Sequence, residues 1–168
     1  MKTIYLTGFM GSGKTTIGKE LSTYLHIPVQ DTDKIIVNKT GLSIRAIFNS
    51  HGEPYFRDLE KQILQTLPTR DLIVTTGGGI IIDHENREWM KASGILVYLH
   101  CDFEEIWKRV QHDDNRPLVI NQQKEQIHAI YKSRQSAYED FHVKVDTTSN
   151  SLSEIVEQIG NWVKKEEK

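Results

Sequence analysis

The sequence predicts an α/β fold in which helices cover both faces of a parallel sheet. Short apolar runs rich in β-branched residues alternate with longer amphipathic segments along the chain. This alternation is typical of buried parallel strands joined by right-handed crossover helices. The first apolar run leads directly into a glycine-rich segment that opens a helix. With 168 residues, the chain is expected to form a single domain, 1–168.

The expected strands are 3–7, 28–30, 72–75, 95–99 and 143–145. The expected helices are 14–25, 33–40, 43–49, 53–67, 85–92, 102–111, 124–140 and 151–165. Two stretches depart from the alternation. Helices without a strand occupy approximately 31–62, which we interpret as a substrate-binding insertion beside the site. The polar stretch at approximately 111–123 is too long for an ordinary connection, and we interpret it as a lid.

Composition places the chain among ordinary globular proteins. Hydrophobic residues make up 38%, charged residues 26% and the net charge is −2, so neither nucleic acid nor a membrane is expected as a partner. The apolar runs are shorter than the roughly 20 residues of a spanning helix, and the first residues are too short for a signal peptide. Cys101 is the single cysteine, which favours a reducing, cytoplasmic setting.

The segment 8–15 matches the P-loop pattern G-x-x-x-x-G-K-[ST] and lies between an expected strand and an expected helix. Its glycines let backbone N–H groups and the helix N-terminus point at phosphate oxygens. Lys14 can bridge the β- and γ-phosphates of ATP, and the Thr15 hydroxyl can bind Mg²⁺. The nucleotide contacts expected here are Gly11, Ser12, Gly13, Lys14, Thr15 and Thr16.

Two aspartates, Asp31 and Asp33, follow the second expected strand. We interpret them as pointing to opposite faces at the end of that strand and therefore as having different roles. Asp31 is expected to hold Mg²⁺ through a water molecule, because Mg²⁺ keeps several waters. Asp33 is expected to face the acceptor and take its hydroxyl proton. The alternative is that Asp33 only caps the following helix.

Six motifs together resemble the shikimate kinase family, in order and rough spacing: 8–15, 31–33, 56–60, 76–79, 116–118 and 134–138. The resemblance covers nearly the whole chain. It implies a P-loop NTPase-type three-layer sandwich with a five-stranded parallel sheet, a helical shikimate-binding insertion and a lid. It also implies ATP with Mg²⁺ and shikimate as ligands, shikimate 3-phosphate as the product, and a monomer.

The resemblance assigns the acceptor's carboxylate to Arg57 and Arg134. An arginine suits this role because its guanidinium group can fork onto a planar carboxylate. Glu60 lies one helical turn after Arg57 and could orient it. The alternative for Arg57 is an exposed helix arginine paired with Glu53 or Glu60.

The glycine run 76–79 follows the third expected strand and suits close approach of backbone to a ligand, although a merely flexible loop is the alternative. By resemblance, the N–H of Gly78 or Gly79 reaches the acceptor or the γ-phosphate, and Gly78 is the one expected to bind substrate. Arg116 in the lid is expected to close over the phosphates and stabilise transition-state charge, unless it is an ordinary loop arginine. Arg109 either lies over adenine, as in relatives, or caps its helix.

The chemistry of Asp33, Arg57, Gly78 and Arg134 indicates a hydroxylated carboxylic acid as acceptor, and the resemblance narrows this to shikimate. Three alternatives stay open: a kinase for another small hydroxy acid such as gluconate, a nucleoside monophosphate kinase, and a nucleotide-binding regulatory domain without catalysis. The last is expected to lack Asp33 or the lid arginine, and the sequence contains both.

Overall fold

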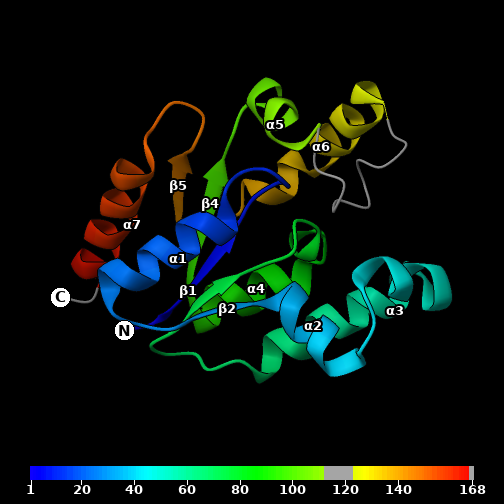
Figure 1. Cartoon of the computed structure of the whole chain (residues 1–168). Coiled ribbons are helices and arrows are strands. Elements are labelled where there is room, and N and C mark those ends of the chain that lie inside the picture. Colours follow the sequence, from blue (N-terminus) through cyan, green and yellow to red (C-terminus); the bar gives the residue numbers. More distant parts are fainter. Residues whose placement is uncertain (112–122, 167–168) are drawn as a thin grey trace.

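The computed structural model describes residues 1–111 and 123–166. Its five parallel strands form one sheet in the order β2-β3-β1-β4-β5 (Figure 1), which confirms the predicted α/β fold. The strands are β1 (Thr3–Thr7), β2 (Val29–Asp31), β3 (Ile73–Thr75), β4 (Gly94–His100) and β5 (Val143–Asp146). Because all strands are parallel, the segments that follow β1, β2 and β3 meet at one edge of the sheet.

Helices pack on both faces of the sheet and create two apolar cores. Helices α1 (Lys14–Leu25) and α7 (Leu152–Glu166) bury their apolar sides against one face, which includes Ile4 and Leu6 of β1. The opposite face, which includes Tyr5, packs against α4 (His84–Ser93), α5 (Phe103–Val110) and α6 (Lys124–Tyr138). The alternation of neighbouring β1 side chains between the cores is the two-residue period of a strand. Burial on both faces explains why the strands read as continuous apolar runs.

Two helices lie between β2 and β3, where the sequence predicted three, and the predicted absence of a strand holds for this described stretch. They are α2 (Thr32–Thr40) and α3 (Ile44–Thr66), and they project to one side of the sheet (Figure 1). They share a small apolar core of their own, formed by Ile36, Ile47, Phe56, Leu59 and Ile63. This core fixes the second half of α3 relative to α2, and therefore fixes the polar side chains that both helices carry.

The predicted helices 43–49 and 53–67 form the single element α3, which is interrupted at Gly52. Gly52 has φ 82° and ψ 170°, a conformation that glycine adopts without a steric penalty. Pro54 follows in the next turn, where its missing N–H has no helical acceptor to lose. The break predicted between the two helices is therefore present, as a kink rather than a loop.

Other differences from the predicted elements are small and lie at their ends. A short 3₁₀ helix, η1 (Ile80–Ile82), follows the glycine run and was not predicted. Helix α2 begins one residue earlier than predicted, because Asp31 caps it. The predicted lid, apart from its first and last residues, and Arg116 within it lie outside the described residues.

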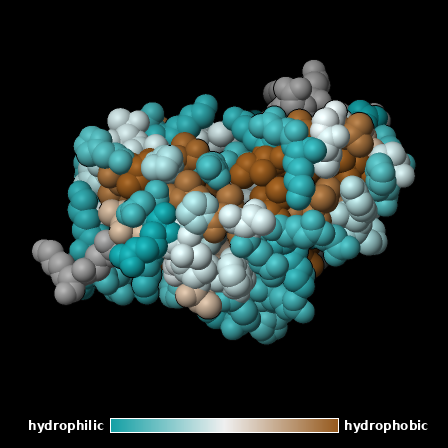
Figure 2. Space-filling view, turned by 90° about the horizontal axis from the view of Figure 1, so that it is seen from below, coloured by the Kyte–Doolittle hydropathy of each residue, from teal (hydrophilic) through white to brown (hydrophobic). Residues whose placement is uncertain are grey.

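Large apolar side chains are sparse on the described surface. Among residues 1–111 and 123–166, no helix is long and apolar enough to cross a bilayer. On the face seen in Figure 2, hydrophobic surface is interrupted by hydrophilic side chains. The large apolar side chains that are more than a third exposed are Leu42, Tyr55, Ile82 and Leu152. Scattered exposure of this kind is ordinary for a folded domain.

Candidate active site

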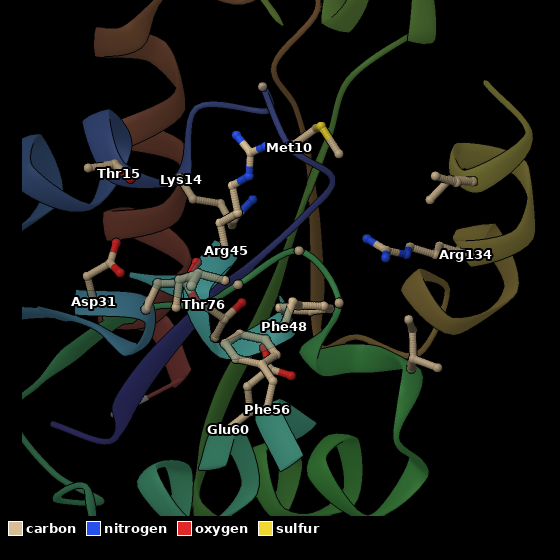
Figure 3. Close-up of a pocket in the computed structure, with 18 of the residues that line it drawn as sticks. Met10, Lys14, Thr15, Asp31, Arg45, Phe48, Phe56, Glu60, Thr76 and Arg134 are labelled. Carbon is tan, nitrogen blue, oxygen red and sulfur yellow. The ribbon is translucent and has the colours of Figure 1, made fainter. Parts of the chain in front are cut away.

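A cleft of about 1230 Å³ opens at the carboxyl ends of β1, β2 and β3 (Figure 3). It brings together most of the residues that the sequence singled out. The lining includes Gly11, Gly13, Lys14, Thr15, Thr16, Asp31, Asp33, Arg57, Gly78, Gly79, Arg109 and Arg134. A phosphate-binding loop and a polar acceptor region therefore share one continuous space.

The P-loop adopts the backbone conformation that its glycines predict. Gly11 has φ +78° and Gly13 has φ +94°, both in the left-handed region. A Cβ atom at Gly11 would lie 2.7 Å from Val110 Cγ1, so a larger residue also lacks space. Lys14 Nζ donates to the carbonyl oxygens of Gly8 at 2.7 Å and Phe9 at 3.1 Å. The lysine ammonium group thus lies at the loop, where a bound phosphate would need it.

Three further P-loop positions were predicted to contact nucleotide. Thr15 and Thr16 lie exposed in the first turn of α1 and line the cleft. Ser12 is fully buried, and its hydroxyl has no hydrogen-bond partner within the described part of the chain. A Cβ atom at Gly8 would lie 2.6 Å from Ser12 Oγ, so the serine side chain packs under the loop. Its side chain supports the loop from below, and only its backbone remains for nucleotide.

Arg109 lines the cleft and connects the P-loop to the segment after β5. Its Nη1 donates to Gly11 O at 3.1 Å and its Nη2 donates to Thr147 O at 2.9 Å. Its Nε donates to Glu105 on the same helix at 3.0 Å. The recipients of its terminal nitrogens lie outside α5, so Arg109 makes contacts beyond its place as a basic residue in the last turn of that helix.

Asp31 and Asp33 point in different directions, but for another reason than the sequence interpretation gave. Asp31 ends β2, whereas Asp33 lies in the first turn of α2, so the two do not stand on one strand. Residues two apart on a strand would share a face. The alternative role for Asp33 is also wrong, since Asp31 is the cap and its Oδ1 accepts from Lys34 N at 3.2 Å.

The donor set around Asp31 fits Mg²⁺ that arrives with a nucleotide. Asp31 Oδ2 accepts a hydrogen bond from Thr75 Oγ1 at 2.8 Å, which fixes the carboxylate at the cleft. A carboxylate has about four lone-pair sites, so capacity for a metal-bound water remains. Residues 1–111 and 123–166 contain no group of three or more His, Cys, Asp or Glu side chains that could hold a metal ion by themselves. The oxygen donors of Thr15 and Asp31 therefore suit a hard cation that nucleotide phosphates help to hold.

Asp33 has the surroundings of a general base. Its Oδ1 is buried, and no donor reaches it from the residues that the structure describes. Burial, followed by the nearby charge of Asp31, raises the pKa of Asp33 to about 6, while Lys14 and Arg57 oppose the shift. A pKa close to neutrality with the carboxylate still dominant at pH 7 suits proton acceptance from a hydroxyl group.

Arg57 is held between two glutamates of its own helix. Its Nε and Nη2 donate to Glu53 Oε1 at 3.1 and 2.9 Å, and its Nη1 donates to Glu60 Oε2. Both predicted pairings are thus present, while the arginine also lines the cleft. A guanidinium group has five N–H donors, so one remains on each terminal nitrogen. These two donors form the pair that a carboxylate needs for bidentate binding.

Arg134 reaches the cleft from α6, across from the insertion (Figure 3). Its guanidinium carbon lies 5.7 Å from the centre of the Phe9 ring. Burial, together with repulsion by Arg57, lowers the pKa of Arg134, although Tyr138 opposes this. Two half-buried guanidinium groups that repel each other would both be stabilised by an anion placed between them.

The glycine run brings backbone close to these side chains. A Cβ atom at Gly77 would lie 2.8 Å from Asp33 Oδ1 and 2.9 Å from Glu60 Oε1. At Gly79 it would lie 2.6 Å from Arg57 Nη1. A side chain at either position would have to displace a charged group of the site, which fits the expected close approach of backbone.

One functional contact was missed by sequence reasoning. The Tyr138 hydroxyl donates to Gly78 O at 2.6 Å and connects α6 to the glycine run. The only available signal was the position of Tyr138 at the end of the motif 134–138.

Comparison with known proteins finds similarity over nearly the whole chain. The family model described as shikimate kinase matches residues 10–164. The shikimate kinase of Bacillus anthracis is 48% identical over 95% of this chain and 96% of its own length. That of Enterococcus faecalis is 39% identical over 98% of this chain and all of its own. The solved shikimate kinase of Acinetobacter baumannii in complex with shikimate is 35% identical, with a TM-score of 0.91 over 99% of this chain and 94% of its own. From this agreement of site, sequence and fold, the chain belongs to the shikimate kinase family.

Proposed function

We propose that this chain transfers the γ-phosphoryl group of ATP to shikimate and forms shikimate 3-phosphate. Support comes from the relatives named shikimate kinase and from the solved neighbour that binds shikimate. The observation that carries the proposal is the pairing of Arg57 and Arg134 across the cleft that also contains the P-loop. Two guanidinium groups beside Asp33 fit an acceptor with both a carboxylate and hydroxyl groups.

The carboxylate of shikimate binds between Arg57 and Arg134 in this proposal. Arg57 contributes its two remaining terminal donors, and Arg134 enters from the opposite wall. Asp33 accepts a hydrogen bond from the attacking hydroxyl and takes its proton. The backbone N–H of Gly78 or Gly79 completes the acceptor site. Holding the hydroxyl in line with the γ-phosphate accounts for much of the catalysis, because phosphoryl transfer depends mainly on positioning and electrostatics.

The phosphate side of the site consists of the P-loop and its lysine. On ATP binding, Lys14 exchanges its bonds to loop carbonyls for the β- and γ-phosphates. Thr15 would hold Mg²⁺ directly and Asp31 would hold it through water, and the ion would supply charge neutralisation at the phosphates. Arg109 lies where it can face the adenine. Arg116 in the lid remains a sequence prediction for charge stabilisation. A monomer in the cytoplasm also belongs to the proposal, as the sequence suggested.

The test is an assay of ADP release with shikimate, gluconate and nucleoside monophosphates as acceptors. We expect turnover with shikimate and none with the nucleotides. Turnover with gluconate but not shikimate would contradict the assignment.

Arg57→Ala tests the carboxylate contact directly. Loss of charge-assisted hydrogen bonds costs about 1.5–3 kcal/mol, so the KM for shikimate should rise about ten- to a hundredfold while the KM for ATP changes little. Arg45→Ala is the matched control. Arg45 lines the same cleft from the same element and forms no hydrogen bond or ion pair with residues in the described ranges. An equal effect of both substitutions would argue against a specific role for Arg57.

A further inference from the structure

Glu60 is a buried carboxyl group whose two oxygens have different surroundings. Its side chain is 1% exposed, and its Oε2 accepts from Arg57 Nη1. Its Oε1 is buried and receives no hydrogen bond from any described residue. This oxygen and Asp33 Oδ1, which also lacks a donor, face the same point beside Gly77. If Glu60 is ionised, its Oε1 is removed from water and receives no hydrogen bond in return. Burying a charged oxygen without a donor costs free energy.

The charged groups that face Glu60 come from three helices. Arg57 and Glu53 lie on α3 beside it, Asp33 faces it from α2, and Arg134 faces it from α6. Together with Glu60, this set therefore contains three carboxyl groups and only two guanidinium groups to neutralise them. The carboxylate of shikimate would add a fourth negative group that draws on the same two arginines.

Glu60 is the carboxyl group of this set that most readily becomes neutral. Burial raises the pKa of Glu60 to about 7, and Arg57 opposes the shift only in part. Glu53 is 57% exposed, so water solvates its carboxyl group. Lys14 faces Asp33 from the P-loop and favours its ionised form. When an anion binds Arg57 and Arg134, their support for a charged Glu60 weakens, so its affinity for a proton increases.

We propose that Glu60 takes up one proton from solvent when shikimate binds, so that the acceptor complex contains the neutral acid. The inference rests on the proposed function, since shikimate is the anion that recruits the arginines. As an acid, Glu60 still accepts from Arg57 through Oε2 and gains an O–H at Oε1, the oxygen that lacks a donor. Glu60 is then a positioning residue that anchors Arg57 in the empty site and removes one negative charge from the filled site.

Isothermal titration calorimetry of the full chain with shikimate tests this. Paired buffers of different ionisation enthalpy give the number of protons taken up. We expect uptake approaching one proton at about pH 8, and an affinity that falls up to about tenfold per pH unit above about pH 7. Glu60→Gln is isosteric and always neutral, so it should abolish the uptake and flatten the pH dependence. Glu53→Gln is the matched control, because Glu53 shares Arg57 but is exposed, and its variant should retain the uptake.

Shikimate binding by the wild type without proton uptake in this pH range would overturn the inference and leave the proposed function standing. Uptake that persists in Glu60→Gln would overturn it as well. No binding by the wild type at any pH would contradict the proposed function and the inference together. If Glu60→Gln does not fold, carbon-13 NMR of the wild-type Glu60 carboxyl group decides. Shikimate should raise its titration midpoint, and an unchanged midpoint would overturn the proposal.

Discussion

Tyr138 donates a hydrogen bond from its hydroxyl to the carbonyl oxygen of Gly78, 60 residues earlier in the chain, at 2.6 Å. The tyrosine is almost completely buried, and its ring stacks on Tyr98 with 5.0 Å between the ring centres. It lies one helical turn after Arg134 on α6. One helix therefore carries a proposed carboxylate ligand and also fixes the glycine run on the other side of the acceptor.

Tyr138→Phe should weaken shikimate binding without abolishing it. The substitution removes one hydrogen bond, worth about 1 kcal/mol, so the KM for shikimate should rise about fivefold with little change in the KM for ATP. Tyr131→Phe is the control, because Tyr131 lies on the same helix and donates to Cys101 O at 3.0 Å, away from the glycine run. Steady-state kinetics of both variants check this. Equal increases in KM would assign the effect to α6 in general.

Gly79→Ala should impair acceptor binding much more than Gly78→Ala. A Cβ atom at Gly79 would lie 2.6 Å from Arg57 Nη1, whereas at Gly78 the nearest atoms lie 3.5 Å away. Displacing Arg57 should raise the KM for shikimate on the order of tenfold or more. Both alanines keep the backbone N–H, so the comparison isolates space from hydrogen bonding. The prediction fails if Gly78→Ala has the larger effect.

Asp33→Asn should lower kcat by a factor on the order of 10² or more, because the amide cannot accept the hydroxyl proton. Asp58→Asn is a suitable control, since Asp58 is exposed on α3 and should leave kcat unchanged. In the wild type, kcat/KM for shikimate should also decline as the pH falls through about 6, where Asp33 of the empty site becomes protonated. Turnover within a few-fold of wild type in Asp33→Asn would rule out the base role.

The stability of the empty protein should fall as the pH rises from about 4.5 to about 7. The pKa of Glu60 is raised to about 7 from an ordinary 4.5, so the folded state binds more protons than the unfolded state in this window. The contribution has an upper bound of about 3 kcal/mol. Denaturant unfolding at both ends of the window measures it. Glu60→Gln should remove this part of the slope and Glu53→Gln should not. A slope that Glu60→Gln leaves intact would place its origin elsewhere.

Much of the fold followed from local patterns. The central strands β1, β3 and β4 are buried on both faces, so their apolar runs were visible without any alignment. The P-loop glycines Gly11 and Gly13 have the left-handed backbone that their motif requires. The kink at Gly52 falls between the predicted helices 43–49 and 53–67, since Glu53 and Pro54 suit the first turn of a new helix. Features that depend on one or two neighbouring residues could be predicted well.

The parts of the site that were missed depend on elements far apart in the sequence. The raised pKa of Glu60 requires burial by three helices, and the bond from Tyr138 to Gly78 requires α6 to lie against the glycine run. The geometry of Asp31 and Asp33 was misjudged because one cap residue decides where a strand ends and a helix begins. Sequence reasoning named side chains that the structure brings together in one cleft, but it could not determine how they share protons and charges.

Lys14 donates to the carbonyl oxygens of Gly8 and Phe9 in its own loop. These two hydrogen bonds brace the loop before a phosphate is present. A bound phosphate would replace the hydrogen bonds of Lys14 to these carbonyl oxygens. Because the loop is already ordered, nucleotide binding should cost little conformational entropy. A neutral residue at this position would remove a ligand for the γ-phosphate and also the brace that keeps the vacant loop ready to receive it.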